Sequence, residues 1–182
     1  MTDFLGDATE LLRRTPDVLR SLLLGLPASW VETPDREGGW TPKDVVGHLV
    51  TAELDNYLTR AEHILEHGAT KPFEPFDRFV HLERDKGQTL DQLVERFADL
   101  RSANVAKLTR LVDDGDLDRL GLHPAIGEVT MRELLATWTV HDLDHISQIF
   151  AGMAGSRDGA VGAWKMYLGI LLRRYDPAAV PG

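Results

Sequence analysis

Helix-start signals recur along this chain, and each precedes a long segment with apolar residues at helical spacing. Thr41 is followed by Pro42 and then by an acid in the same turn, a pattern typical of a helix N-terminus. The segments 89–92 and 130–133 have the Thr-x-x-Gln and Thr-x-x-Glu spacing of a capping box. No segment alternates apolar and polar residues over a strand bounded by hairpin turns. The sequence therefore predicts an all-α fold.

The predicted helices span residues 2–25, 41–67, 89–112 and 130–155, with a shorter fifth helix over 161–175. Pro16 should kink or restart the first of them. Together they predict a four-helix bundle with a short additional C-terminal helix, and 182 residues suit a single domain over 1–182. The connection 68–88 is long enough to be a crossover, a lid or an interface element, or else a surface excursion with its own apolar cluster.

The composition argues against several classes of partner and chemistry. A net charge of −9 repels a phosphate backbone, so we expect no nucleic acid. The N-terminus lacks the basic region of a secretory signal, and the longest uncharged runs fall short of the roughly 18 apolar residues of a membrane span. We therefore expect a cytoplasmic protein that does not associate with a membrane. The chain contains no cysteine, which excludes disulfides, thiolate metal ligands and a thiol nucleophile of its own.

Two histidines on the predicted helix 130–155 are the clearest candidates for chemistry. His141 and His145 fall within the apolar arc that includes Trp138 and Ile149, so both imidazoles should point into the core. Side chains four residues apart on a helix have Cβ atoms about 5–6 Å apart, which lets two imidazoles share a metal ion. The alternative is two core histidines whose nitrogens bond to carboxylates or water.

A metal site needs a further ligand from another element. His48 lies two turns into the helix 41–67, at the edge of a broad apolar arc, so periodicity permits it to face the core without requiring it. His67 at a helix end and His81 in the long connection are expected to be solvated. His123, just before the helix 130–155, could line the mouth of a pocket or be an ordinary loop residue.

Two separated motifs make the chain recognisable. Trp40-Thr-Pro-Lys-Asp-Val-Val-Gly-His48-Leu, followed much later by His141-Asp-Leu-Asp-His145-Ile-Ser-Gln148, resembles the DinB-like (DinB/YfiT) superfamily. The likeness extends over essentially the whole chain, through Leu11-Leu-Arg-Arg-Thr-Pro, Phe73-Glu-Pro-Phe-Asp-Arg and His123-Pro-Ala-Ile-Gly-Glu-Val-Thr. It implies a four-helix bundle that holds one divalent metal ion, commonly nickel or zinc. At the matching positions it implies His48, His141 and His145 as the metal ligands. Because relatives commonly dimerise, it also implies a possible homodimer, for which exposed aromatics in 68–88 would suit an interface.

Other polar residues surround the expected site. Asp144 and Gln148 are candidates for orienting the ring N–H groups, and the helical wheel puts them nearer the metal face than Asp142; a solvated rim is the alternative. Arg101 and Asn104 project from the apolar arc of the helix 89–112. A buried Arg101 requires an anion, which is either Glu53 in an internal pair or a substrate. With His123, these residues form a possible substrate pocket.

Three imidazole ligands leave at least one coordination position open. The resemblance implies thiol S-transferases and mycothiol-dependent isomerases among relatives. We therefore predict a metal-dependent transferase that activates an exogenous low-molecular-weight thiol for conjugation to an electrophile. One alternative is a metal-dependent hydrolase with Asp144 or Glu53 as general base. The other is a non-enzymatic, stress-related metal-binding protein.

Overall fold

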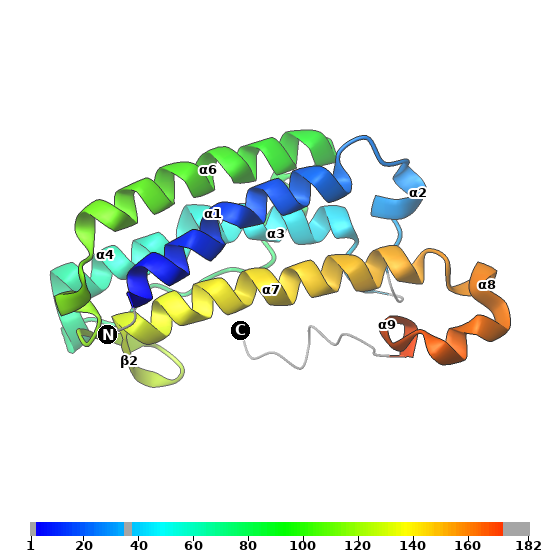
Figure 1. The fold of residues 1–182 in the computed structure, drawn as a ribbon. Coiled ribbons are helices and arrows are strands. Elements are labelled where there is room, and N and C mark those ends of the chain that lie inside the picture. The colour runs from blue at the N-terminus through cyan, green and yellow to red at the C-terminus, as the bar shows by residue number, and fades with distance from the viewer. Residues whose placement is uncertain (1–2, 35–37, 173–182) are drawn as a thin grey trace.

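Four long helical stretches run side by side in the computed structural model, which describes residues 3–34 and 38–172 (Figure 1). They are α1 (Phe4–Leu23), α3 (Pro42–Asp55) with α4 (Tyr57–His67), α6 (Leu90–Leu111) and α7 (Met131–Gly155). Helices α1 and α3 each pack against both α6 and α7. The predicted four-helix bundle is confirmed.

The helix starts follow from local sequence. The hydroxyl oxygens of Thr41, Thr89 and Thr130 each accept a hydrogen bond from the backbone N–H three residues later. In return, the side chains of Asp44, Gln92 and Glu133 accept from the backbone N–H of those threonines. These reciprocal bonds satisfy N–H groups that have no partner within the helix, which is why the starts are readable from sequence.

The helix expected over 41–67 is divided at Asn56, whose φ of −118° and ψ of −90° lie outside the helical region. Asparagine is a poor helix former because its side chain competes for backbone hydrogen bonds. The Asn56 N–H still donates to the carbonyl of Ala52, and Tyr57 begins α4 directly afterwards. The second stretch of the bundle is therefore a helix pair, α3 followed by α4.

A short β-hairpin, absent from the sequence prediction, precedes α7. Strand β1 (Leu120–His123) pairs antiparallel with β2 (Gly127–Thr130). Four residues per strand are too few for an alternating pattern to be evident. Gly121 lies where a Cβ would approach Ile64 Cγ1 to 2.6 Å and the Phe73 ring to 2.7 Å, so only glycine lets the hairpin approach α4 this closely.

The prediction of a single fifth helix over 161–175 is wrong. The chain instead forms α8 (Asp158–Val161), the 3₁₀ segment η3 (Gly162–Tyr167) and α9 (Gly169–Leu172), at the end of α7 opposite the hairpin (Figure 1). Gly162, with φ of +58°, interrupts the helix between α8 and η3. Trp164 and Tyr167 are each 72% exposed, so they do not form the buried face of an amphipathic helix. Residues 173–175 of that prediction lie outside the described residues.

The connection 68–88 packs on the bundle. It contains η1 (Gly68–Thr70) and α5 (His81–Arg84), which lies against α3. Phe73 is buried in the core and Phe76 is half-buried, whereas Phe79 is 50% exposed, so the expected exposure of the aromatics in this connection holds for Phe79 alone. His81, expected in solvent, is only 2% exposed because α5 presses it against α3 and Trp40. The other short elements are α2 (Ala28–Val31) and η2 (Asp114–Asp116).

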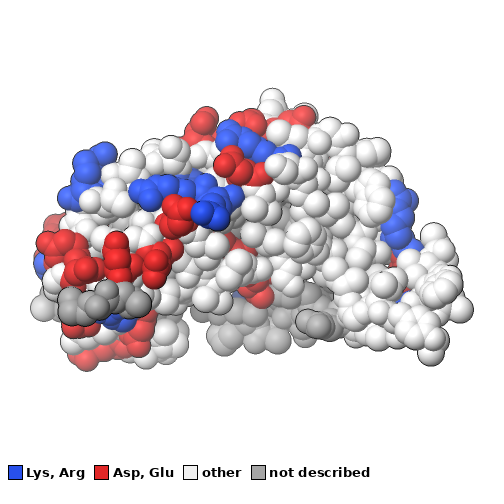
Figure 2. Space-filling view, in the orientation of Figure 1, with Lys and Arg blue, Asp and Glu red and all other residues white. Residues whose placement is uncertain are grey.

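The core consists of two apolar clusters along the bundle. One includes Leu12, Val105 and Trp138, and the other includes Leu19, Phe97 and Ile149. No helix among the described residues combines the length and hydropathy needed to cross a membrane. On the face drawn in Figure 2, basic side chains lie next to acidic ones and form no continuous basic stripe.

Candidate metal centre

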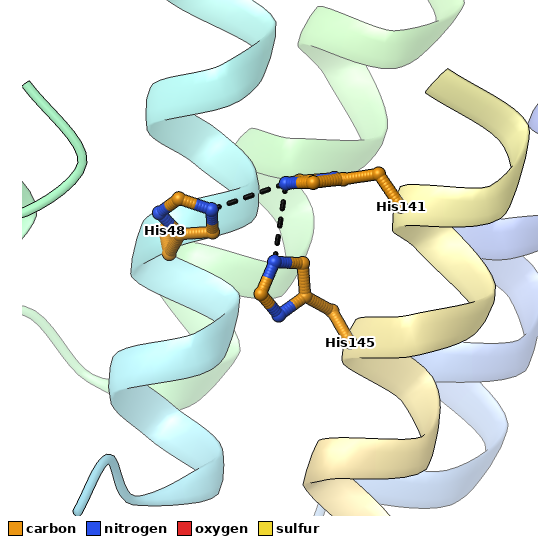
Figure 3. Close-up of side chains that lie close together, drawn as sticks. All are labelled: His48, His141 and His145. Atoms are coloured by element: carbon orange, nitrogen blue, oxygen red, sulfur yellow. Dashed lines mark hydrogen bonds between the residues drawn. The ribbon is translucent and has the colours of Figure 1, made fainter. Parts of the chain in front are cut away.

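Three imidazole rings from two distant segments converge inside the bundle. His48 comes from α3, and His141 and His145 lie one turn apart on α7 (Figure 3). The Nε2 atom of His141 lies 3.1 Å from Nε2 of His48 and 3.1 Å from Nε2 of His145. Among the described residues this histidine triad is the one group of at least three histidine or acidic side chains arranged to hold a metal ion.

Neighbouring oxygens fix the protons of the two outer rings. His48 Nδ1 donates to the carbonyl oxygen of Arg78 at 3.2 Å, and His145 Nδ1 donates to Gln148 Oε1 at 2.8 Å. Because each proton sits on Nδ1, the Nε2 atom of each neutral ring carries a lone pair. Both lone pairs point toward His141. Gln148 therefore has the ring-orienting position expected of it.

The third ring, His141, cannot donate a hydrogen bond to both neighbouring Nε2 atoms. His141 Nε2 carries at most one hydrogen, whereas two lone pairs face it, and its Nδ1 is buried without a hydrogen-bond partner. A cation with metal–nitrogen distances of about 2.1 Å separates neighbouring ligand nitrogens by about 3.0 to 3.4 Å. The observed spacing and the all-imidazole donor set fit a divalent ion such as zinc or nickel.

Burial keeps the triad neutral. Loss of hydration, aided by the neighbouring His145, lowers the pKa of His48 to about 3. Burial is also the largest cause of the lowered pKa values of His141 and His145. Neutral imidazole is the form that binds metals, so the folded chain holds all three rings in the ligating state at neutral pH.

Aromatic side chains cover the triad on the side of the long connection. The centroid of the Trp40 ring lies 4.9 Å from that of His48 and 6.4 Å from that of His145, nearly parallel to the latter. Phe76 contacts His48 edge-on, and the buried His81 ring lies 5.7 Å from His48. Trp40 belongs to the sequence motif, but the part played by the connection was not predictable from periodicity because it depends on how 68–88 folds back.

Next to the triad, Arg101 links all four stretches of the bundle. From α6 it donates to Glu53 on α3 and to Asp142 on α7, and its Nη1 also donates to the Leu12 carbonyl on α1 at 3.0 Å. That carbonyl lacks a helical partner because Pro16, four residues later, has no N–H. The structure thus favours the internal Arg101–Glu53 pair over a clamp for a substrate anion.

The remaining predicted site residues are placed differently. Asp142 is fully buried against Arg101, whereas Asp144 is exposed and its charge acts on the neighbouring His145. Asn104 donates to Glu53 and belongs to the Arg101 cluster. Among the described ring contacts, His123 meets Phe73 and no member of the triad.

Known proteins that resemble this chain are named as metal-dependent, in agreement with a metal centre at the histidine triad. The family model of the DinB superfamily matches residues 11–149. The chain belongs to the DinB superfamily. Among DinB-like relatives, a protein of Geobacillus kaustophilus is 30% identical over 147 residues, which cover 76% of this chain and 78% of that protein. YfiT of Bacillus subtilis is 27% identical over 143 residues, covering 77% and 79% of the two chains. Both carry the name "Putative metal-dependent hydrolase".

Solved structures support the fold of this DinB-superfamily chain. The structure of YfiT from Bacillus subtilis, described as having "an unusual four-helix bundle topology", aligns with a TM-score of 0.73 at 24% identity. The alignment covers 88% of this chain and 90% of YfiT. A second four-helix bundle protein, TT2238, aligns with a TM-score of 0.54 at 21% identity over 81% of this chain and 98% of the other. The bundle is thus shared at low sequence identity.

Proposed function

We propose that this DinB-superfamily protein binds one divalent metal ion, nickel or zinc, through His48, His141 and His145. The observation that carries the proposal is the convergence of two lone-pair-bearing Nε2 atoms on a third, half-buried imidazole. Such an arrangement leaves nitrogen lone pairs without partners in the absence of a cation. The names of the relatives, which call them metal-dependent, agree with this.

We further propose that the protein is a transferase that conjugates an exogenous low-molecular-weight thiol to an electrophile. A divalent cation held by three imidazoles supplies Lewis acidity, which lowers the pKa of a thiol and makes it a better nucleophile. Since the chain contains no cysteine, the thiol must come from solution. Three protein ligands leave at least one coordination position for it.

The residues around the triad suit this chemistry. The Arg78 carbonyl and Gln148 hold two of the rings with their Nε2 atoms toward one another. Trp40 and Phe76 flank His48 with apolar surface, which limits access of water and offers a wall against which an apolar electrophile can pack.

Hydrolysis is the second candidate, favoured by the names of the relatives. It needs a general base in addition to the metal ligands. Glu53 is unsuited to that role because its carboxylate accepts four N–H hydrogen bonds, from Arg101, Asn104 and Trp138, and is buried. Asp144 is exposed and remains the candidate base. Thiol activation needs no such base, and we therefore place it first.

Elemental analysis of untagged protein tests the metal site. We expect about one nickel or zinc ion per chain in the wild type, far less in His145→Ala, and wild-type content in His63→Ala. His63 is a suitable control because it lies on α4 and its ring contacts His67 and Phe73. Equal metal content in the wild type and His145→Ala would contradict the proposed site.

Activity assays separate the two reactions. Metal-loaded protein is incubated with an alkylating electrophile and either bacillithiol or mycothiol, and loss of thiol is followed. We expect a rate above that of buffer which disappears in His145→Ala. Turnover of ester or amide substrates without added thiol, together with no thiol consumption, would favour the hydrolase instead.

A further inference from the structure

Beside the triad lies a charged cluster that the proposed chemistry does not use. It consists of Glu53, Arg101 and Asp142, whose side chains are at most 1% exposed. One guanidinium faces two carboxylates. If both carboxylates are ionised, the cluster carries a net charge of −1 in the core, an unusual arrangement because an uncompensated buried charge is costly.

Both carboxyl groups are surrounded by hydrogen-bond donors, an arrangement that favours a carboxylate. Glu53 accepts from Arg101 Nε and Nη2, Trp138 Nε1 and Asn104 Nδ2. Asp142 accepts from Arg101 Nη1 and Nη2 and from the Thr15 hydroxyl. Burial raises the pKa of Glu53 above its ordinary value and Asp142 adds to this rise, while Arg101 and Asn104 offset only part of it. A protonated carboxyl group would need an acceptor for its own hydrogen, and none of the N–H donors around Glu53 supplies one.

The cluster lies directly behind the triad. Asp142 follows His141 in the chain. Trp138, which donates to Glu53, stacks on Tyr57 with ring centroids 5.3 Å apart, and Tyr57 meets the His141 ring edge-on at 5.3 Å. Trp138 and Tyr57 thus form a continuous path of contacts from the Glu53 carboxylate to the His141 imidazole. Because these contacts are buried and apolar, the charges of the two regions interact with little screening.

We propose that the Glu53–Arg101–Asp142 cluster is an electrostatic counterion for the cation held by the histidine triad. This inference rests on the proposed metal site. Three neutral imidazoles leave a divalent ion with its full charge in the core, and the excess carboxylate offsets part of it. The cluster also explains why two acids surround a single arginine, since one would suffice for an internal ion pair. Glu53 and Asp142 act at a distance, without ligating the metal.

Metal affinity tests the proposal. Zinc and nickel dissociation constants are measured by competition with a chromophoric chelator for the wild type, Glu53→Gln and Asp142→Asn. Each substitution removes one negative charge and keeps the size of the side chain. We expect each to weaken metal binding by about tenfold to a hundredfold, with little dependence on salt between 0.05 and 0.5 M because the charges are buried.

Asn104→Ala is the matched control. It removes a hydrogen bond to the same Glu53 carboxylate without changing its charge, so we expect a change in metal affinity below about twofold. Unfolding of the metal-free proteins reports the structural cost of each variant separately. If Glu53→Gln does not fold, Asp142→Asn provides the same comparison.

The outcomes distinguish this inference from the proposed function. Weak binding in the charge variants, with near wild-type binding in a destabilised Asn104→Ala, supports the counterion. Unchanged affinity in Glu53→Gln and Asp142→Asn, or equal weakening by Asn104→Ala, would overturn it while leaving the metal site intact. A wild type that binds no metal would overturn the metal site first, and the counterion with it.

Discussion

Replacing Arg101 by methionine should sharply destabilise the metal-free protein. Methionine fills much the same volume but donates no hydrogen bonds. Arg101 is 1% exposed and makes hydrogen bonds to Glu53, Asp142 and the Leu12 carbonyl. Removing one partner of a buried ion pair costs about 3–5 kcal/mol, and here two carboxylates are left. We therefore expect Arg101→Met to lose at least about 4 kcal/mol of unfolding free energy.

This loss should depend on pH in a defined direction. Arg101 lowers the pKa of Glu53, so without the guanidinium burial raises that pKa in the folded state further above about 4, the unfolded value. The folded variant then binds protons that the unfolded chain releases, so its stability falls as pH rises above about 4. Relative to the wild type, Arg101→Met should thus be more destabilised at pH 8 than at pH 5.

Urea unfolding followed by circular dichroism at both pH values measures this, with Arg20→Met as control. Arg20 also joins α1 to α6 through a carboxylate, Glu95, but that pair is exposed to solvent. Exposed pairs contribute little to stability, so the control should remain close to the wild type. If Arg101→Met lost no more stability than Arg20→Met, or lost the same amount at pH 5 and pH 8, the reasoning about a buried charge cluster would be refuted.

Three further predictions concern the triad and the hairpin. Burial lowers the pKa of His48 to about 3, so at a pH below the ordinary histidine pKa of 6.5 the unfolded chain binds a proton that the folded chain does not. Chelator-treated protein should therefore lose stability from pH 7 to pH 4. A urea midpoint that does not change with pH would argue against buried neutral rings. Gln148→Ala should weaken metal binding by about tenfold through loss of ring orientation, and chelator competition showing wild-type affinity would contradict this. Gly121→Ala should lower the unfolding free energy by about 1–3 kcal/mol because its Cβ would overlap core side chains, whereas Gly159→Ala, with open space around it, should leave the thermal midpoint near that of the wild type.

Some of the fold and site was readable from the sequence because it depends on contacts within one or two helical turns. The capping boxes at Thr89 and Thr130 involve residues three apart, and both helices begin where they predict. The pairing of His141 with His145 follows from the helical repeat alone. The buried Arg101 was evident because a charged residue interrupts an apolar arc and requires a partner.

What only the tertiary structure decided is which faces of different helices meet. Periodicity left His48 at the edge of its arc, and its position is settled by the packing of α3 against α7. It did not show that Asp142 faces Arg101 from α7. His81 and the Arg78 carbonyl reach the triad through a connection without helical periodicity. A sequence specifies local hydrogen bonds and apolar arcs, whereas the rotation of each helix about its axis is set by the simultaneous packing of all its neighbours.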